Sequence, residues 1–204
     1  MPLAFQPSDP ARYEAAIRRF DEENARDPNT VTVDAKPQPR ELIYAQWVTD
    51  WVLRLQPNAS EALRLAARSQ HICRWMSPRD SYPMTRAGYL KWRADLKQFH
   101  AQKAGEILRK VGYPEDVIHR VQDLNLKKHF PQDDECRALE DALCLVFLER
   151  QFADLAAKSD DEKMINALQK SWKKMTPSAR AKALKLEFGS HEKALIARAI
   201  SNQV

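Results

Sequence analysis

Residues Leu63–Trp75 read LRLAARSQHICRW, and residues Leu96–Leu108 read LKQFHAQKAGEIL. Both stretches have the apolar spacing of a helix, and each sets one histidine, His71 or His100, among apolar residues. A polar side chain on a buried stripe costs stability unless a neighbouring polar group, a water or a metal satisfies it. Each histidine is therefore either a hydrogen-bonded core residue or a metal ligand.

The composition around these stretches predicts an all-α protein. Of its 204 residues, 44% are apolar and 30% are charged, with only four glycines, and alternating strand-like runs are almost absent. We expect helices over about residues 10–26, 40–55 and 63–75, and a long helix that ends at Gly112. The segment from Thr30 to Pro39 is interpreted as a loop because it holds two prolines.

The domain organisation that we expect is a helical domain over residues 1–157, with a helical extension over residues 158–204 packed on it. After Ser159 the chain becomes amphipathic and rich in lysine, over about residues 164–175 and 178–188, and residues 191–200 form a last short helix.

Charge and cysteine content narrow the functional classes. The net charge of +5 suits an anionic ligand, but no run of five or six basic residues predicts a nucleic-acid tail. Three cysteines without a C-x-x-C pair argue against a disulfide framework and against a cysteine zinc site. The N-terminal residues do not resemble a secretory signal, and no stretch approaches eighteen apolar residues. We therefore expect a cytoplasmic protein without a membrane partner.

Four helical patterns each place a polar residue on an apolar or partly apolar stripe: Glu41, His71, His100 and Asp141. Imidazoles and carboxylates are the ligands of divalent metals whose coordination shell keeps a position open for water or substrate. These four side chains could bind a divalent metal of unknown identity. The same side chains could instead form a metal-free hydrogen-bonded network.

A second group of residues favours an anionic, base-containing ligand. The candidate substrate-binding residues are Arg74, Arg79, Arg86, Tyr89 and Arg93, because arginines interleaved with aromatic rings suit a planar base that carries a phosphate. The alternative is a solvated loop whose aromatic residues anchor it. Lys128 continues an apolar stripe, and with Glu41 it is a candidate catalytic residue. We expect a phosphorylated small molecule or nucleotide as the partner, with nucleic acid less favoured.

Several phrases resemble those of HD-domain proteins. Residues Ala66–Ile72, AARSQHI, are similar to the helix in which a His-Asp dyad follows a small apolar run. Residues His100–Val117, HAQKAGEILRKVGYPEDV, are similar to an HD segment with a helix, a glycine turn and Pro-Glu-x-Val. Residues Leu139–Ala142 resemble the closing aspartate helix.

The chain also departs from the HD pattern. Gln70 and His71 replace the dyad, Glu41 or a residue near it replaces the first histidine, and Lys127 and Lys128 stand where many HD proteins have a further histidine. The resemblance implies an HD-like helical bundle over residues 38–157. Carried over position by position, it implies His71, His100 and Asp141 as metal ligands, with Glu41 as a weaker candidate.

Across nearly its full length the chain resembles an uncharacterised family, the domain of unknown function DUF4202. The phrases that carry this resemblance are Arg68–Trp75, Tyr82–Tyr89 and Leu139–Glu149. The HD resemblance implies metal-dependent hydrolysis of a phosphate ester. The alternatives are a catalytically degenerate HD-like domain that binds a nucleotide or RNA and, third, an HD-like metal-dependent oxygenase. Composition and spacing leave the substrate and the oligomeric state open.

Overall fold

The structure, a computed structural model, describes residues 5–201 of the chain. The chain forms two compact units, Met1–Phe130 and Pro131–Val204, here called unit 1 and unit 2. The division after Phe130 places the apolar helix around Leu145 in unit 2, whereas the sequence-based boundary after residue 157 kept it in the first domain.

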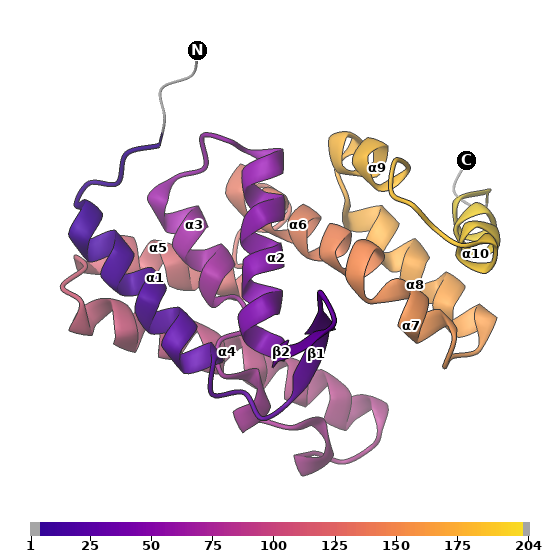
Figure 1. The fold of residues 1–204 in the computed structure, drawn as a ribbon, viewed down its shortest axis with the longest axis horizontal. Helices are drawn as coiled ribbons and strands as arrows, with labels where there is room; N and C mark the ends of the chain where they lie inside the picture. Colours follow the sequence, from indigo (N-terminus) through magenta and orange to yellow (C-terminus); the bar gives the residue numbers. More distant parts are fainter. Residues whose placement is uncertain (1–4, 202–204) are drawn as a thin grey trace. The chain divides into compact units, whose positions relative to one another are not determined.

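Unit 1 is a helical bundle with one small hairpin (Figure 1). Its elements, in chain order, are α1 (Pro10–Asn24), β1 (Thr30–Val33), β2 (Lys36–Pro39), α2 (Arg40–Leu55), α3 (Glu61–Ser69), η1 (Arg74–Met76), η2 (Arg79–Ser81), α4 (Arg86–Lys110) and α5 (Glu115–Leu126). The mostly helical fold that the composition indicates is confirmed.

Local signals in the sequence start and stop these helices. The side chains of Asp9, Ser60 and Thr85 each accept a hydrogen bond from a backbone N–H in the first turn of the helix that follows. Gly112 has a φ of 84° just after α4, a conformation that glycine adopts without strain. The predicted end of the long helix at Gly112 is confirmed.

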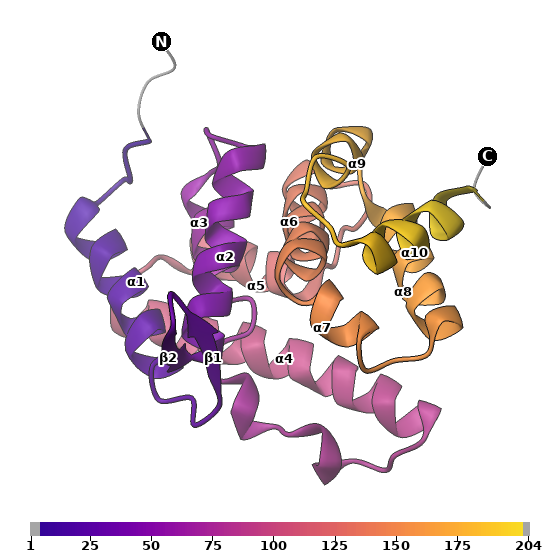
Figure 2. The ribbon, with the colours of Figure 1, turned by 45° about the vertical axis from the view of Figure 1, so that its right-hand side comes forward.

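The expected loop from Thr30 to Pro39 is instead a two-stranded antiparallel hairpin, so that prediction was wrong. Val33 pairs with Lys36, and the two residues between them, Asp34 and Ala35, both have positive φ. Such a two-residue turn matches the twist of the flanking strands. The prolines are tolerated because neither strand has a second neighbour. Figure 2 shows the hairpin beside the first turns of α2.

The core of unit 1 lies where α3 packs against α2 and α5, and α4 packs along α5. Leu63, Leu65, Val48 and Leu124 are fully buried there. Gly105 allows α4 and α5 to approach closely, since a Cβ at this position would lie 2.5 Å from the Gln122 amide nitrogen.

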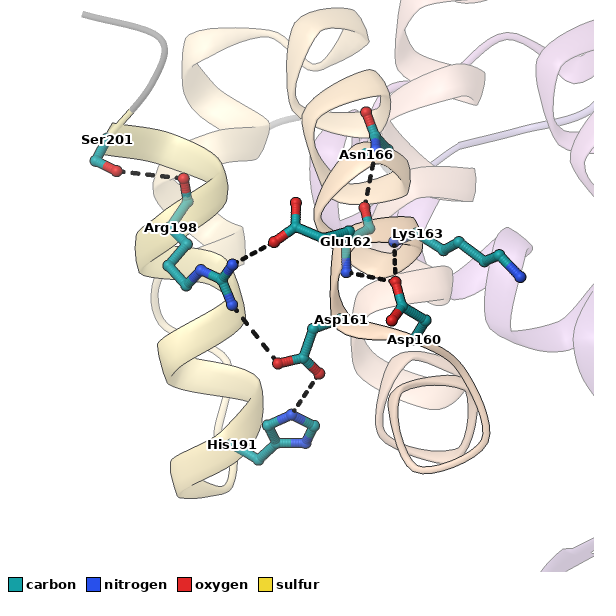
Figure 3. Close-up of polar contacts among 8 residues, drawn as sticks. All are labelled: Asp160, Asp161, Glu162, Lys163, Asn166, His191, Arg198 and Ser201. Carbon is teal, nitrogen blue, oxygen red and sulfur yellow. Dashed lines mark hydrogen bonds and ion pairs between the residues drawn. The ribbon is translucent and has the colours of Figure 1, made fainter.

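Unit 2 contains α6 (Asp134–Arg150), α7 (Phe152–Ala156), α8 (Asp161–Lys174), α9 (Pro177–Ala183) and α10 (Ser190–Ser201). Figure 3 shows how α10 is joined to the start of α8: Arg198 contacts Asp161 and Glu162, and His191 Nε2 lies 3.1 Å from Asp161. These charges are exposed, so we expect each pair to contribute little stability. On the other face of α10, Leu195 and Ala199 are buried.

No helix within residues 5–201 is long and apolar enough to cross a membrane.

Candidate functional site

Glu41, His71 and His100 lie together in unit 1, although they come from three separate segments. Glu41 is in the first turn of α2, and His100 is in the middle of α4. His71 was expected on a helix, but α3 ends at Ser69, so His71 lies in the turn that leads to η1. Cys73, with a φ of 54°, reverses the chain in this turn. The His71 and His100 ring centroids are 5.7 Å apart.

His100 is held in one orientation by the turn that carries His71. Its Nδ1 atom lies 2.8 Å from the backbone oxygen of Ile72, so Nδ1 carries the proton and donates it. The buried Nε2 atom therefore has a lone pair, and it has no hydrogen-bond partner among the described residues. Burial lowers the pKa of His100 to about 3, so its ring is neutral.

Glu41 is buried, and its position depends on Asp27. Asp27 Oδ2 accepts a hydrogen bond of 3.0 Å from the Glu41 backbone N–H, which caps α2 where Pro39 provides no side-chain cap. Burial raises the pKa of Glu41 to about 7, and the nearby charge of Arg74 opposes this effect. Glu41 Oε2 lies 3.7 Å from His71 Nδ1 and has no hydrogen-bond partner in the described part of the chain.

The His71 ring stacks on Tyr44, with ring centroids 4.4 Å apart and an interplanar angle of 6°. About one fifth of the His71 side chain is accessible to solvent, so it lies at the outer edge of the group. Burial lowers the pKa of His71 well below its ordinary value. Three positive charges, those of Arg74, Lys127 and Arg93, lower this pKa further. A neutral imidazole beside three cations is a suitable setting for an anion.

The candidate substrate-binding arginines do different things. Arg74 lies over the Trp92 ring, 5.1 Å from its centroid, and Arg93 lies 5.9 Å from the centroid of the Tyr89 ring. Arg79 donates hydrogen bonds to the backbone oxygens of Tyr82, Pro83 and Thr85, so its guanidinium holds the loop. Arg86 is exposed in the first turn of α4. Arg74 and Arg93 are the two whose charges act on His71.

Lys128 does not continue a buried stripe as expected, because α5 ends at Leu126 and Lys127 is left-handed with a φ of 58°. Lys128 Nζ lies 2.5 Å from Asp123 Oδ1 on the surface. The lysine whose charge reaches His71 is Lys127. No sequence pattern predicts this shift of one residue, since left-handed residues are uncommon outside glycine.

Asp141 is buried in unit 2, and its carboxylate has a local role there. Oδ1 accepts a hydrogen bond from the Thr176 backbone N–H at 2.9 Å, and Oδ2 accepts one from the Thr176 hydroxyl at 2.6 Å. Thr176 is the N-cap of α9. Asp141 therefore fixes the start of α9, which accounts for a carboxylate on the buried face of α6. The convergence of Asp141 with the two histidines stays a prediction.

These side chains meet only some of the requirements for binding a divalent metal. Within residues 5–201, no group of three or more histidine, cysteine, aspartate or glutamate residues is placed to hold a metal ion. His100 nevertheless has the features of a ligand, because one ring nitrogen donates to a carbonyl while the other has a buried lone pair.

Comparison with known proteins places this helical chain in a family. The model of the family described as "Domain of unknown function (DUF4202)" matches residues 14–196. The chain belongs to the DUF4202 family. No curated protein and no solved structure matches it. The match covers both units, so the DUF4202 domain includes the histidine pair of unit 1 and Asp141 of unit 2.

Two buried amides of this DUF4202 domain, Asn24 and Asn125, were not singled out in the sequence. Asn24 Oδ1 accepts a hydrogen bond from the Cys73 backbone N–H, which steadies the turn that carries His71. Asn125 Nδ2 donates to Ser69 Oγ at the end of α3. Gln70, which precedes His71, is also buried. Isolated amides give no sequence signal of their own, because their partners are 49 and 56 residues away.

Proposed function

We propose that unit 1 binds a phosphorylated, base-containing small molecule beside His71 and, with a divalent metal, hydrolyses its phosphate ester. The observation that supports this most is electrostatic: the His71–His100 pair is neutral, and the positive charges of Arg74, Lys127 and Arg93 all act on the His71 ring. The HD-like character of the helical core is part of the same proposal, and it rests on the phrases around Gln70 and His100.

The three cations would bind the phosphate. Arginine grips a phosphate with two parallel donors, and lysine acts as a compact positive charge. They come from η1, α4 and the end of α5, so an anion between them would be held from three segments. The His71 ring is already neutral, so it does not have to lose a proton when the ligand enters.

Tyr89 is the aromatic residue best suited to stack on a base. It is exposed, and its ring lies 5.9 Å from that of Trp92, which is buried and donates its indole N–H to the Ser77 oxygen. Trp92 therefore anchors the segment, whereas Tyr89 is 41% exposed, with Arg79 and Arg93 each 5.9 Å from its ring centroid. Stacking on such a ring is tolerant of base identity.

His71 and His100 would contribute imidazole ligands to the metal, which would supply Lewis acidity to water and offset charge on the phosphoryl group. His100 Nε2 supports this assignment, since it is buried without a hydrogen-bond partner among the described residues. Glu41 Oε2, which is also buried without such a partner, would remain available as the base.

In the hydrolytic reaction Glu41 would act as the base. Burial raises its pKa to about 7, which is the range in which a carboxylate can take a proton from water at neutral pH. His100, with a pKa of about 3, would not exchange protons at that pH, so its role would be that of a neutral ligand.

The second candidate function is binding without chemistry. Two observations favour it: no three ligating side chains converge within residues 5–201, and Gln70 and His71 stand in place of the HD dyad. An oxygenase needs a richer set of histidines than this pair, so we rank it below both.

The test starts with elemental analysis of untagged protein, followed by titration with mononucleotides, sugar phosphates and a short RNA. We expect saturable binding of a mononucleotide, weakened at least tenfold in Arg93→Ala and Lys127→Ala. Lys110→Ala is the matched control, because it removes one charge from the other end of α4.

Phosphate release is then measured with and without added Mg²⁺, Mn²⁺ or Co²⁺. Metal-dependent release that is lost in His100→Ala supports hydrolysis. Binding without release under any metal supports the binding module. Binding to RNA alone, with the steep salt dependence of counterion release, would contradict the small-molecule site.

A further inference from the structure

One stretch of unit 1 exposes an unusual set of apolar side chains. Met76, Met84, Tyr89 and Leu90 are large, exposed and lie within fifteen residues of one another along the chain; Met84 is 77% exposed and Leu90 is 57% exposed. We call them the Met76–Leu90 surface. In both ribbon views this stretch lies at the lower edge of unit 1 (Figure 1, Figure 2). A cluster of exposed apolar residues of this kind often marks an interaction site.

Hydrogen bonds and close packing hold this loop in the position that exposes its apolar side chains. Arg79 ties the loop together through the backbone oxygens of Tyr82, Pro83 and Thr85, and the Tyr82 hydroxyl donates to Asp95 on α4. Gly88 lets the loop lie directly on α4, since a Cβ there would stand 2.1 Å from the Pro83 oxygen. Because these contacts hold the loop backbone at both ends, Met84 remains exposed to solvent.

The surface is also cationic. Arg86 and Arg93 are exposed on the first two turns of α4, and the exposed Lys91 between them pairs with Asp95 at 2.8 Å. Asp80 is the only acidic residue between Met76 and Arg93. Apolar tips surrounded by basic side chains are the combination that binds at an anionic lipid interface, where the tips enter the headgroup region and the cations meet the lipid phosphates.

We propose that the Met76–Leu90 surface docks unit 1 onto an anionic lipid membrane. This is a surface contact, so it needs no membrane-spanning helix, and it revises the expectation that membranes are not partners. Tyr89 and Arg93 are shared with the proposed ligand site, but Met76, Met84 and Leu90 have no part in it, so variants of these three residues test the membrane contact independently of the proposed hydrolysis.

The chemistry disfavours the other occupants. A second copy docked face to face would bring Arg86, Lys91 and Arg93 against the same positive charges. A nucleic acid would satisfy the cations but would give the methionine and leucine tips no apolar partner. A protein partner needs about 800 Å² of complementary surface on each side, whereas these side chains project from a loop and a helix end.

The experiment is co-sedimentation of the full chain with vesicles of phosphatidylcholine alone, or with about one third phosphatidylserine. We expect binding to the anionic vesicles and little binding to the neutral ones. Met84→Ser with Leu90→Ser should lower the partition coefficient at least about tenfold, since two apolar tips are lost. Arg86→Gln should lower it about fivefold.

Leu184→Ser is the matched control, because it removes an equally exposed leucine from unit 2. Circular dichroism checks that each variant is folded, as expected for exposed positions. No binding to either vesicle, or equal binding of the Met84/Leu90 double variant and Leu184→Ser, overturns the proposal. Binding of an acidic peptide or RNA that the same double variant abolishes, without vesicle binding, assigns the surface to that partner instead.

Discussion

The Nδ1 atom of His100 donates a hydrogen bond of 2.8 Å to the backbone oxygen of Ile72, the residue that follows His71. One contact therefore fixes the tautomer of His100 and joins the middle of α4 to the turn that presents His71. It also accounts for a histidine on the buried stripe of α4, since half of its hydrogen-bonding capacity is satisfied by backbone. The other half, Nε2, is what a ligand could use.

Substituting His100 should separate its structural and binding roles. His100→Ala should lower the free energy of unfolding by about 2–4 kcal/mol, because it leaves the Ile72 oxygen unpaired and a cavity behind. His100→Asn can still donate to Ile72 and should cost about half as much. Urea unfolding measures both. If the protein contains metal, both variants should lose it, and a chelator should lower the Tm of wild type alone. Equal destabilisation by both substitutions would contradict the role of the Nδ1 hydrogen bond.

Glu41 should make stability depend on pH. Burial raises its pKa from 4.5 to about 7, so the folded protein binds this proton more tightly than the unfolded chain does. Its stabilising contribution is fully present below about pH 4.5 and is lost as the pH rises to about 7 and above. The loss is about 3 kcal/mol. In metal-free protein, Glu41→Gln should therefore gain this amount relative to wild type between pH 4.5 and pH 8.

His100 changes the pH dependence of stability in the opposite direction. Its pKa is lowered to about 3, so its contribution is present above about pH 6.5 and is lost as the pH falls. The Glu41 effect is isolated by subtracting the wild-type unfolding free energy from that of Glu41→Gln at each pH, since both proteins keep His100. A difference that does not change with pH would show that Glu41 ionises as easily in the folded protein as in the unfolded chain.

Asp141 offers a test of a structural carboxylate against a metal ligand. Asp141→Ala should destabilise the protein by about 1–3 kcal/mol, because it removes both hydrogen bonds to the start of α9. Asp141→Asn keeps one acceptor for the Thr176 N–H and should cost about 1 kcal/mol or less. A near-native Asp141→Asn protein with an unchanged metal content supports the local role alone. Loss of bound metal from this folded variant would restore Asp141 as a ligand.

The pair formed by Arg68 and Asp21 should be the most stabilising ion pair between α1 and α3. Arg68 Nε and NH2 donate to the two oxygens of Asp21 at 2.6 and 2.7 Å, and its side chain is only 13% exposed. Arg68→Lys should cost about 1 kcal/mol, because a lysine cannot form both parallel hydrogen bonds. Arg19→Lys, in an exposed pair with Glu22, should change stability by less than about 0.5 kcal/mol. Urea unfolding measures both variants. If Arg68→Lys and Arg19→Lys lower the free energy of unfolding by similar amounts, the two parallel hydrogen bonds from Arg68 to Asp21 do not add the expected stability.

Much of the helical framework could be predicted because its signals are local. The helix expected over residues 40–55 is observed over the same residues, and the long helix ends at Gly112 as expected. The hairpin was missed because its turn, Asp34 and Ala35, lacks the usual glycine and because prolines mask the second strand. Within the candidate site, the burial of His100 and Glu41 followed from their positions on apolar stripes.

The sequence by itself determined where most helices begin and end and which faces are apolar, because caps and helical spacing act over a few residues. Only the tertiary structure decided that His71 lies beside Glu41 and His100. It also decided that the charge of Lys127, and not that of Lys128, acts on His71. Within unit 2, it decided that Asp141 binds Thr176, the N-cap residue of α9. Left-handed residues at Cys73 and Lys127 redirect the side chains that follow. Such turns are stabilised by distant partners, as Asn24 stabilises the turn at Cys73, and spacing along the chain does not encode them.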